Sequence, residues 1–196
     1  MYTSRTGLIL GFHGTDKSIV NEILLGNKEL EPSENSHDWL GNGIYFWDNS
    51  PSRALEWAKT QSLNIESKIK EPAIIGAIID LGYCLDLLDY KNSQLLIKGH
   101  EWLCRMVEDA KVTLPKNTGH NADLLNRKLD CAVIQSLHQM NNVNEEKNFE
   151  PVRGVFWEGE PIYKDGFFME KNHIQICVRN INCIKGYFNP LPRIIN

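Results

Sequence analysis

The sequence predicts an α+β fold, and three observations carry this prediction. The chain has 196 residues, the size of one domain, so we expect a single domain over 1–196. Short apolar runs bounded by turn residues, such as 73–80, predict buried strands. Apolar residues three or four positions apart, from Leu125 to Met140, predict an amphipathic helix. The chain contains no repeats and no low-complexity segment, so both kinds of element belong to one mixed domain.

The first third of the chain predicts two strands, each followed by a helix. Gly7–His13 is a short apolar run that predicts a strand ending at His13. Thr15 or Asp16 can then cap a helix with its side-chain oxygen. The elements expected next are a helix over 18–25 stopped by Gly26, a loop over 27–42, a strand over 44–47, and a helix from Pro51 to about Lys68.

The rest of the chain predicts more helix and then a group of late strands. Pro72 ends the preceding helix, and the continuous apolar run over 73–80 predicts a strand that is buried on both faces. The elements expected after it are helix within 87–110, the helical stripe 125–140, strands over 152–157 and 173–178, and a last strand over 181–188 that closes the sheet.

Composition excludes several classes of protein. The formal net charge of −4 argues against a dedicated non-specific nucleic-acid binder, which normally carries a basic stripe. The longest apolar run, 73–79, is too short to span a bilayer, and Met1–Arg5 lacks the form of a signal peptide. Five widely spaced cysteines without a C-x-x-C pair favour reduced thiols and give no support for zinc. We therefore expect a cytoplasmic protein without a membrane segment or a metal. The common kinase, hydrolase and zinc-protease motifs are also absent.

The stretch 41–48 predicts an aromatic shelf beside a cleft. Tyr45 alternates with Ile44 and Phe46 along the strand, so it points to the opposite face from them. A phenol ring on that face can stack on a flat heterocycle, although a tyrosine at a sheet edge would give the same pattern. His13 ends the first strand beside Gly14, where its imidazole can hydrogen-bond a ligand or simply satisfy a turn.

Three segments together resemble the diphtheria-toxin and poly(ADP-ribose) polymerase branch of the ADP-ribosyltransferases. They are Phe12-His13-Gly14-Thr15, then Gly41-Asn42-Gly43-Ile44-Tyr45-Phe46, then Ser52-Arg53-Ala54 at the head of a helix. The clear resemblance covers residues 7–58. It implies a small split antiparallel sheet surrounded by helices, with a helical insertion in 59–150, and NAD as co-substrate.

The resemblance also implies roles for individual residues. His13 would bind the nicotinamide ribose, and Thr15 would bind the adenosine ribose. The backbone of Gly14 and the hydroxyl of Ser52 would bind the carboxamide. Tyr45 would stack on the nicotinamide ring, with Trp57 in place of a second stacking tyrosine. The family's third element is a glutamate on a late strand, and here the sequence departs from the pattern. Along 173–178, Ile174, Ile176 and Val178 form the core face, and His173, Gln175 and Cys177 form the other.

Gln175 is therefore the strand residue expected at the ribose, where it can hydrogen-bond a hydroxyl but carries no charge. Glu158 and Glu160 lie upstream, and Glu170 precedes the strand; Glu160 or Glu170 is expected as an acidic helper, and surface glutamates would fit as well. In this family a missing glutamate implies transfer of single ADP-ribose units or lost activity.

The expected function is transfer of ADP-ribose from NAD to a macromolecular acceptor, protein or nucleic acid, with His13, Tyr45 and Gln175 as catalytic residues. Small transferases of this kind resemble toxins of toxin–antitoxin or phage-defence systems, which implies an inhibitory antitoxin partner. Two alternatives stay open. One is a catalytically silent module that binds NAD or ADP-ribose, and the other is an interaction protein on the same fold.

Overall fold

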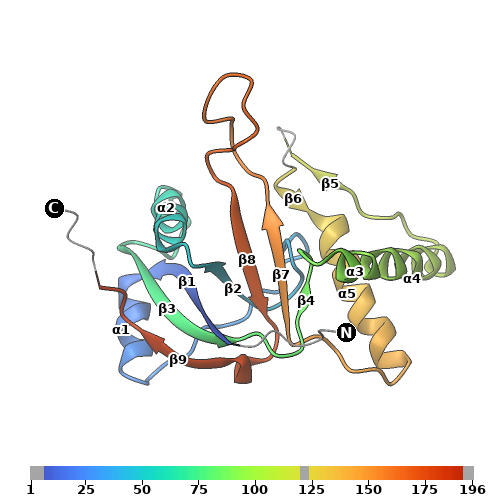
Figure 1. Ribbon diagram of the computed structural model, residues 1–196, viewed down its shortest axis with the longest axis horizontal. Helices are drawn as coiled ribbons and strands as arrows, with labels where there is room; N and C mark the ends of the chain where they lie inside the picture. Colours follow the sequence, from blue (N-terminus) through green and yellow to red (C-terminus); the bar gives the residue numbers. More distant parts are fainter. Residues whose placement is uncertain (1–6, 120–123, 192–196) are drawn as a thin grey trace.

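The computed structural model describes residues 7–119 and 124–191, which form an α+β fold around one seven-stranded sheet (Figure 1). The strand order is β4-β7-β8-β2-β1-β3-β9. Its strands are β1 (Leu8–Asp16), β2 (Ile44–Asp48), β3 (Pro72–Asp80), β4 (Leu85–Asp86), β7 (Pro151–Phe156), β8 (His173–Val178) and β9 (Ile184–Phe188). Neighbouring strands are antiparallel except for β4 and β7, which are parallel. The expected purely antiparallel sheet is therefore wrong at this edge.

The short link between β3 and β4 shows that the sheet is strongly curved. Residues 81–84 are all that connects β3 to β4, yet these strands are five places apart in the sheet order. Five strand spacings in a flat sheet would separate them by about 24 Å. Four linking residues span less than this distance. The two ends of the sheet must therefore curl toward each other.

The helices gather at the two ends of the sheet (Figure 1). They are α1 (Lys17–Leu24), α2 (Pro51–Ser62), α3 (Tyr90–Ser93), α4 (Leu95–Ala110), α5 (Lys128–Val143) and the 3₁₀ helix η1 (Ile181–Cys183). Helices α1 and α2 lie by β1 and β3, whereas α3, α4 and α5 lie by β4 and β7 with the small ladder of β5 (Asn117–Thr118) and β6 (Asn126–Arg127). The segment 59–150 thus supplies β3 and β4 to the main sheet as well as a helical layer. In the described part of the chain no helix combines the length and apolar character that crossing a membrane requires.

Both faces of the central strands are covered, which the sequence pattern did not predict. Phe46, Ile75 and Ile176 belong to one buried cluster. On the other face, Cys177 is buried in a second cluster with Leu40 from the loop before β2 and with Leu137 of α5. The expectation that the core face of β8 is the one with Ile174, Ile176 and Val178 is therefore incomplete, because the loop and α5 also bury Cys177 on the other face.

The element boundaries differ from expectation where a cap or turn decides them. Asp16 is the N-cap of α1, and its carboxylate accepts a hydrogen bond from the Ser18 N–H at 2.9 Å. Helix α2 ends at Ser62 rather than near Lys68, because Asn64 begins a turn in which its side chain accepts from the Glu66 N–H. The last segment forms η1 and then β9 at the sheet edge, beside β3, so it does not close the sheet.

Candidate functional site

A cleft of about 680 Å³ lies where β1 and β2 separate. These two strands pair only at Gly11–Asp48 and Phe12–Trp47. One residue further along β1, His13 already lines the cleft, with Tyr45 and Trp47 contributed by β2. The other walls are the loop before β2, one side of α2 from Arg53 to Gln61, β8 at Gln175, and the segments next to β7 and β8 that carry Glu158 and Lys171. A cavity of this size is typical of a small-molecule or cofactor site.

The cleft brings together four of the residues singled out from the sequence. They come from four different elements: His13 from β1, Tyr45 from β2, Trp57 from α2 and Gln175 from β8. Gln175 lies opposite Trp47 on one neighbouring strand and Gly154 on the other. Residues up to 162 positions apart in the sequence thus share one concave surface.

The imidazole of His13 is fixed by the backbone of β2. Its Nδ1 lies 2.7 Å from the carbonyl oxygen of Tyr45. A carbonyl only accepts, so Nδ1 carries the hydrogen and donates it. Burial lowers the pKa of His13, which favours the neutral ring. The lone pair of its Nε2 is therefore free to accept a hydrogen bond from a ligand hydroxyl.

The hydroxyl of Tyr45 serves the loop rather than the cleft. It donates to the Gly41 carbonyl at 2.6 Å and accepts from the Leu40 N–H at 2.9 Å. Burial raises the pKa of Tyr45 above its ordinary value, so the phenol stays protonated. What Tyr45 offers a ligand is consequently the face of its ring.

Three of the expected cofactor-binding residues do not line the cleft. Gly14 packs under α2, where an added Cβ would come within 2.3 Å of the Ala54 carbonyl oxygen. It therefore allows the helix to lie close to β1. Ser52 is exposed to solvent, and Thr15 is half-buried on β1 outside the cleft lining. On α2 the cleft is instead lined by Arg53, Glu56, Trp57 and Thr60, which share one helical face.

The three glutamates near β8 also separate into two groups. Glu160 and Glu170 are exposed in the long hairpin loop (residues 157–172) that projects from β7 and β8 (Figure 1), and neither lines the cleft. Glu158 does line it, two residues after β7 ends. The sequence predicted Glu160 or Glu170 as the acidic helper, so the glutamate that lines the cleft is a different one.

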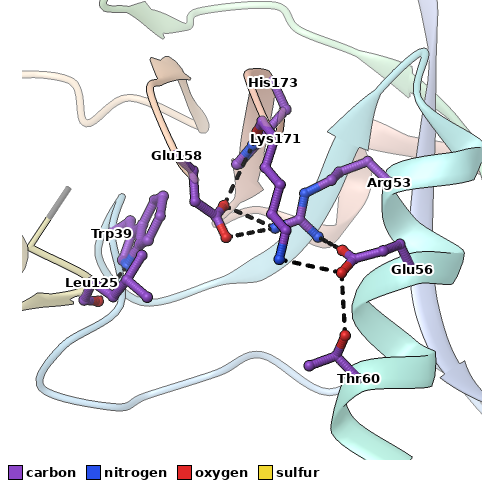
Figure 2. Close-up of polar contacts among 8 residues, drawn as sticks. All are labelled: Trp39, Arg53, Glu56, Thr60, Leu125, Glu158, Lys171 and His173. Atoms are coloured by element: carbon purple, nitrogen blue, oxygen red, sulfur yellow. Dashed lines mark hydrogen bonds and ion pairs between the residues drawn. The ribbon is translucent and has the colours of Figure 1, made fainter. Parts of the chain in front are cut away.

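Charged residues form a connected network across the cleft (Figure 2). Both carboxylate oxygens of Glu158 lie 2.8 Å from Nη2 of Arg53. Nη1 of the same arginine pairs with Glu56, whose carboxylate also lies 3.3 Å from the Lys171 ammonium. The network joins α2 to both ends of the long hairpin loop.

Several buried polar atoms beside this network have no internal partner. Nε1 of Trp47, Nε of Arg53 and Nε2 of His173 lack hydrogen-bond partners within residues 7–119 and 124–191. Buried polar groups are normally satisfied, so these atoms are exceptions beside the network. Burial also lowers the pKa of His173, which keeps its ring neutral 3.7 Å from Glu158. In the described ranges no group of three or more His, Cys, Asp or Glu side chains is placed to hold a metal ion.

Sequence reasoning missed Arg53, Trp47 and His173 as parts of this site. Arg53 follows Ser52 directly. Which of the two side chains faces the cleft depends on how the helix is rotated about its axis. Trp47 lines the cleft, and His173 lies beside it, 3.7 Å from Glu158. Both belong to the same alternation that predicted Tyr45 and Gln175, so that pattern already contained a signal for them.

Comparison with known proteins yields one distant relative. The chain is 26% identical over 190 residues to the uncharacterized protein MJ0359 of Methanocaldococcus jannaschii, a match that covers 89% of this chain and 83% of the archaeal protein. The match leaves out little of the chain, so it includes most of segment 59–150. No family model matches the sequence, and no solved structure matches the chain.

Proposed function

We propose that this chain is an NAD-dependent mono-ADP-ribosyltransferase. The observation that carries the proposal is the convergence of His13, Tyr45, Trp57 and Gln175 on one cleft at the separation of β1 and β2. These residues were selected from the sequence by their resemblance to NAD-binding positions. The cleft volume of about 680 Å³ suits a ligand of dinucleotide size.

The chemistry of the cleft matches the parts of NAD. The rings of Tyr45 and Trp57 supply flat faces for nicotinamide. Nε2 of His13 accepts from one ribose hydroxyl, and the amide of Gln175 can bond another. Arg53 adds to the cleft lining a cation of the kind that bonds phosphate oxygens.

In the proposed reaction the bond between ribose C1′ and the nicotinamide nitrogen breaks, and the electron pair leaves with nicotinamide. A nucleophile of the acceptor then forms a bond to C1′. The long hairpin loop supports a macromolecular acceptor, because Tyr163, Phe167 and Phe168 are exposed along it. Protein and nucleic acid remain alternative acceptors, and an antitoxin that covers the cleft would be the partner of a toxin. A cytoplasmic location belongs to the same proposal.

One observation favours a second function, that of a catalytically silent module for NAD or ADP-ribose. The β8 residue in the cleft is Gln175, where the resemblance implies a glutamate. A module of this kind would bind NAD and leave its nicotinamide bond intact.

Incubation of the purified protein with NAD labelled on nicotinamide or on adenine tests both functions. Release of nicotinamide supports the transferase, and adenine label retained on material from a cell extract identifies the acceptor after protease or nuclease digestion. Binding without release supports the silent module. His13→Ala and Tyr45→Ala should abolish release while the protein stays folded. Unchanged release in either variant would remove that residue from the site.

A further inference from the structure

A largely buried carboxylate lines this cleft just after the end of β7, whereas β8 contributes the uncharged Gln175. Glu158 lies after the end of β7, and its side chain is 13% exposed. Figure 2 shows its carboxylate pointing toward Arg53 of α2, on the opposite side of the cleft. The exposed Glu160 and Glu170 have no comparable surroundings, since Glu170 accepts a hydrogen bond from the Glu160 N–H within the loop.

We propose that Glu158 is the catalytic carboxylate of the cleft, an inference that rests on the proposed function. It takes the place of the strand glutamate that the Gln175 position lacks. Arg53 and His173 lie beside its carboxylate, and each of them has a buried nitrogen without an internal partner in the described residues.

Glu56 is another carboxylate that lines the cleft, as do Glu31 and Asp38 of the loop before β2. The partners of Glu56 make it less suited to this role. Arg53, Lys171 and Thr60 all bond its two oxygens. It is also more exposed, at 41%. Two cations therefore offset the charge of Glu56. Glu158 has one arginine nitrogen as its cationic partner in the described structure, while its second neighbour is the neutral ring of His173.

The role follows from the charge that develops during the reaction. As the C1′–N bond breaks, positive charge spreads over ribose C1′ and its ring oxygen. A carboxylate held in a largely water-excluded site stabilises that charge without having to reorganise. When the acceptor attacks C1′, its proton passes to the Glu158 carboxylate. The products are nicotinamide, the ADP-ribosylated acceptor and one proton, which later leaves to solvent.

The test compares Glu158→Gln with Glu160→Gln, a matched substitution two residues away in the exposed loop. NAD affinity is measured by calorimetry, nicotinamide release at saturating NAD gives kcat, and circular dichroism reports folding. Glu158→Gln should lower kcat at least about 100-fold while the NAD dissociation constant changes less than about fivefold. Glu160→Gln should match the wild type within about twofold.

Each other outcome overturns a defined part of the argument. A wild-type kcat in Glu158→Gln, or a change confined to affinity, overturns the assignment of Glu158 and leaves the NAD proposal intact. Wild-type protein that neither binds nor cleaves NAD overturns the proposed function and this inference with it. If Glu158→Gln does not fold, Glu158→Asp keeps the charge but withdraws it by about one bond length, which should lower kcat at least about tenfold. A wild-type rate in that variant would also overturn the assignment.

Discussion

Two arginines of this chain, Arg153 and Arg53, each bridge two carboxylates, and they differ in where those carboxylates lie. Arg153 of β7 bonds Asp48 of β2 at 2.7 and 2.9 Å and Asp86 of β4 at 3.2 Å. Arg53 of α2 bonds Glu158 and Glu56. The two side chains are almost equally buried, at 7% and 11% exposure. Burial alone therefore does not distinguish them.

The difference lies in what each guanidinium leaves unused. All three nitrogens of Arg153 have carboxylate partners, and these partners come from strands of the same sheet. Nε of Arg53 has no partner in the part of the chain that the structure describes, and the residue lines the cleft. The Arg153 pairs join strands of one sheet, whereas the Arg53 pairs lie in the lining of a cleft. We expect the first to matter for stability and the second for activity.

The largest expected effect is that of Arg153→Ala on stability. This substitution leaves two buried carboxylates without their cation, which typically costs about 3–5 kcal/mol. The free energy of unfolding, measured with urea by circular dichroism, should fall by that amount. A loss below about 1 kcal/mol would show that water reaches Asp48 and Asp86, and the contrast with Arg53 would then disappear.

A buried group without a carboxylate partner should respond to acid instead. Burial, and next the charge of Arg179, lower the pKa of His138 to about 4 from its ordinary 6.5. Its Nδ1 bonds only the Ile134 carbonyl at 2.8 Å. Below pH 6.5 the unfolded chain therefore takes up a proton that the folded chain excludes. Stability is fully present above pH 6.5 and falls by about 3 kcal/mol as the pH drops to about 4.

Urea unfolding at several pH values checks this expectation against His138→Asn. The variant should lose less stability between pH 6.5 and 4 than the wild type. His13 and His173 have pKa values that burial also lowers, and both remain in the variant. The difference between the two proteins therefore isolates His138, and equal slopes would contradict the shift.

Sequence patterns predicted well those features that depend on neighbouring residues. Alternation along β2 identified Tyr45 as a residue of the cleft, and the side chain of Asp16 signalled the start of α1. Strand β8 has the predicted limits, 173–178. Each of these features is set by a side-chain period or by one local hydrogen bond.

The remaining features depend on contacts between distant segments. Whether Ser52 or Arg53 faces the cleft depends on how α2 docks against β1, and one residue turns a helix by about 100°. Glu158 is held in the cleft by its pairing with Arg53, which is 105 positions away in the sequence. The parallel pairing of β4 likewise depends on the curvature of the whole sheet. A single sequence carries no local signal for any of these.

Arg53→Ala should lower stability less than Arg153→Ala, by about 2 kcal/mol, because Glu158 and Glu56 regain water from the cleft. Its effect on activity should be larger, with nicotinamide release reduced at least about tenfold. The measurement pairs urea unfolding with the release assay for both arginine variants. If Arg153→Ala were folded and equally impaired in release, the division between a structural and a functional arginine would fail.

The smallest expected effect is that of Tyr45→Phe, which separates the role of the hydroxyl in the loop from the role of the ring in the cleft. Tyr45→Phe removes the hydroxyl that bonds Gly41 and Leu40, at a cost of about 1 kcal/mol. The ring remains, so nicotinamide release should stay within about threefold of the wild type. Tyr45→Ala removes the ring as well and should abolish release. A large loss of release in folded Tyr45→Phe would mean that the hydroxyl, and not the ring, meets the ligand. The loop at Gly41 would then have to move when the ligand binds, because the hydroxyl is committed to that loop in the free protein.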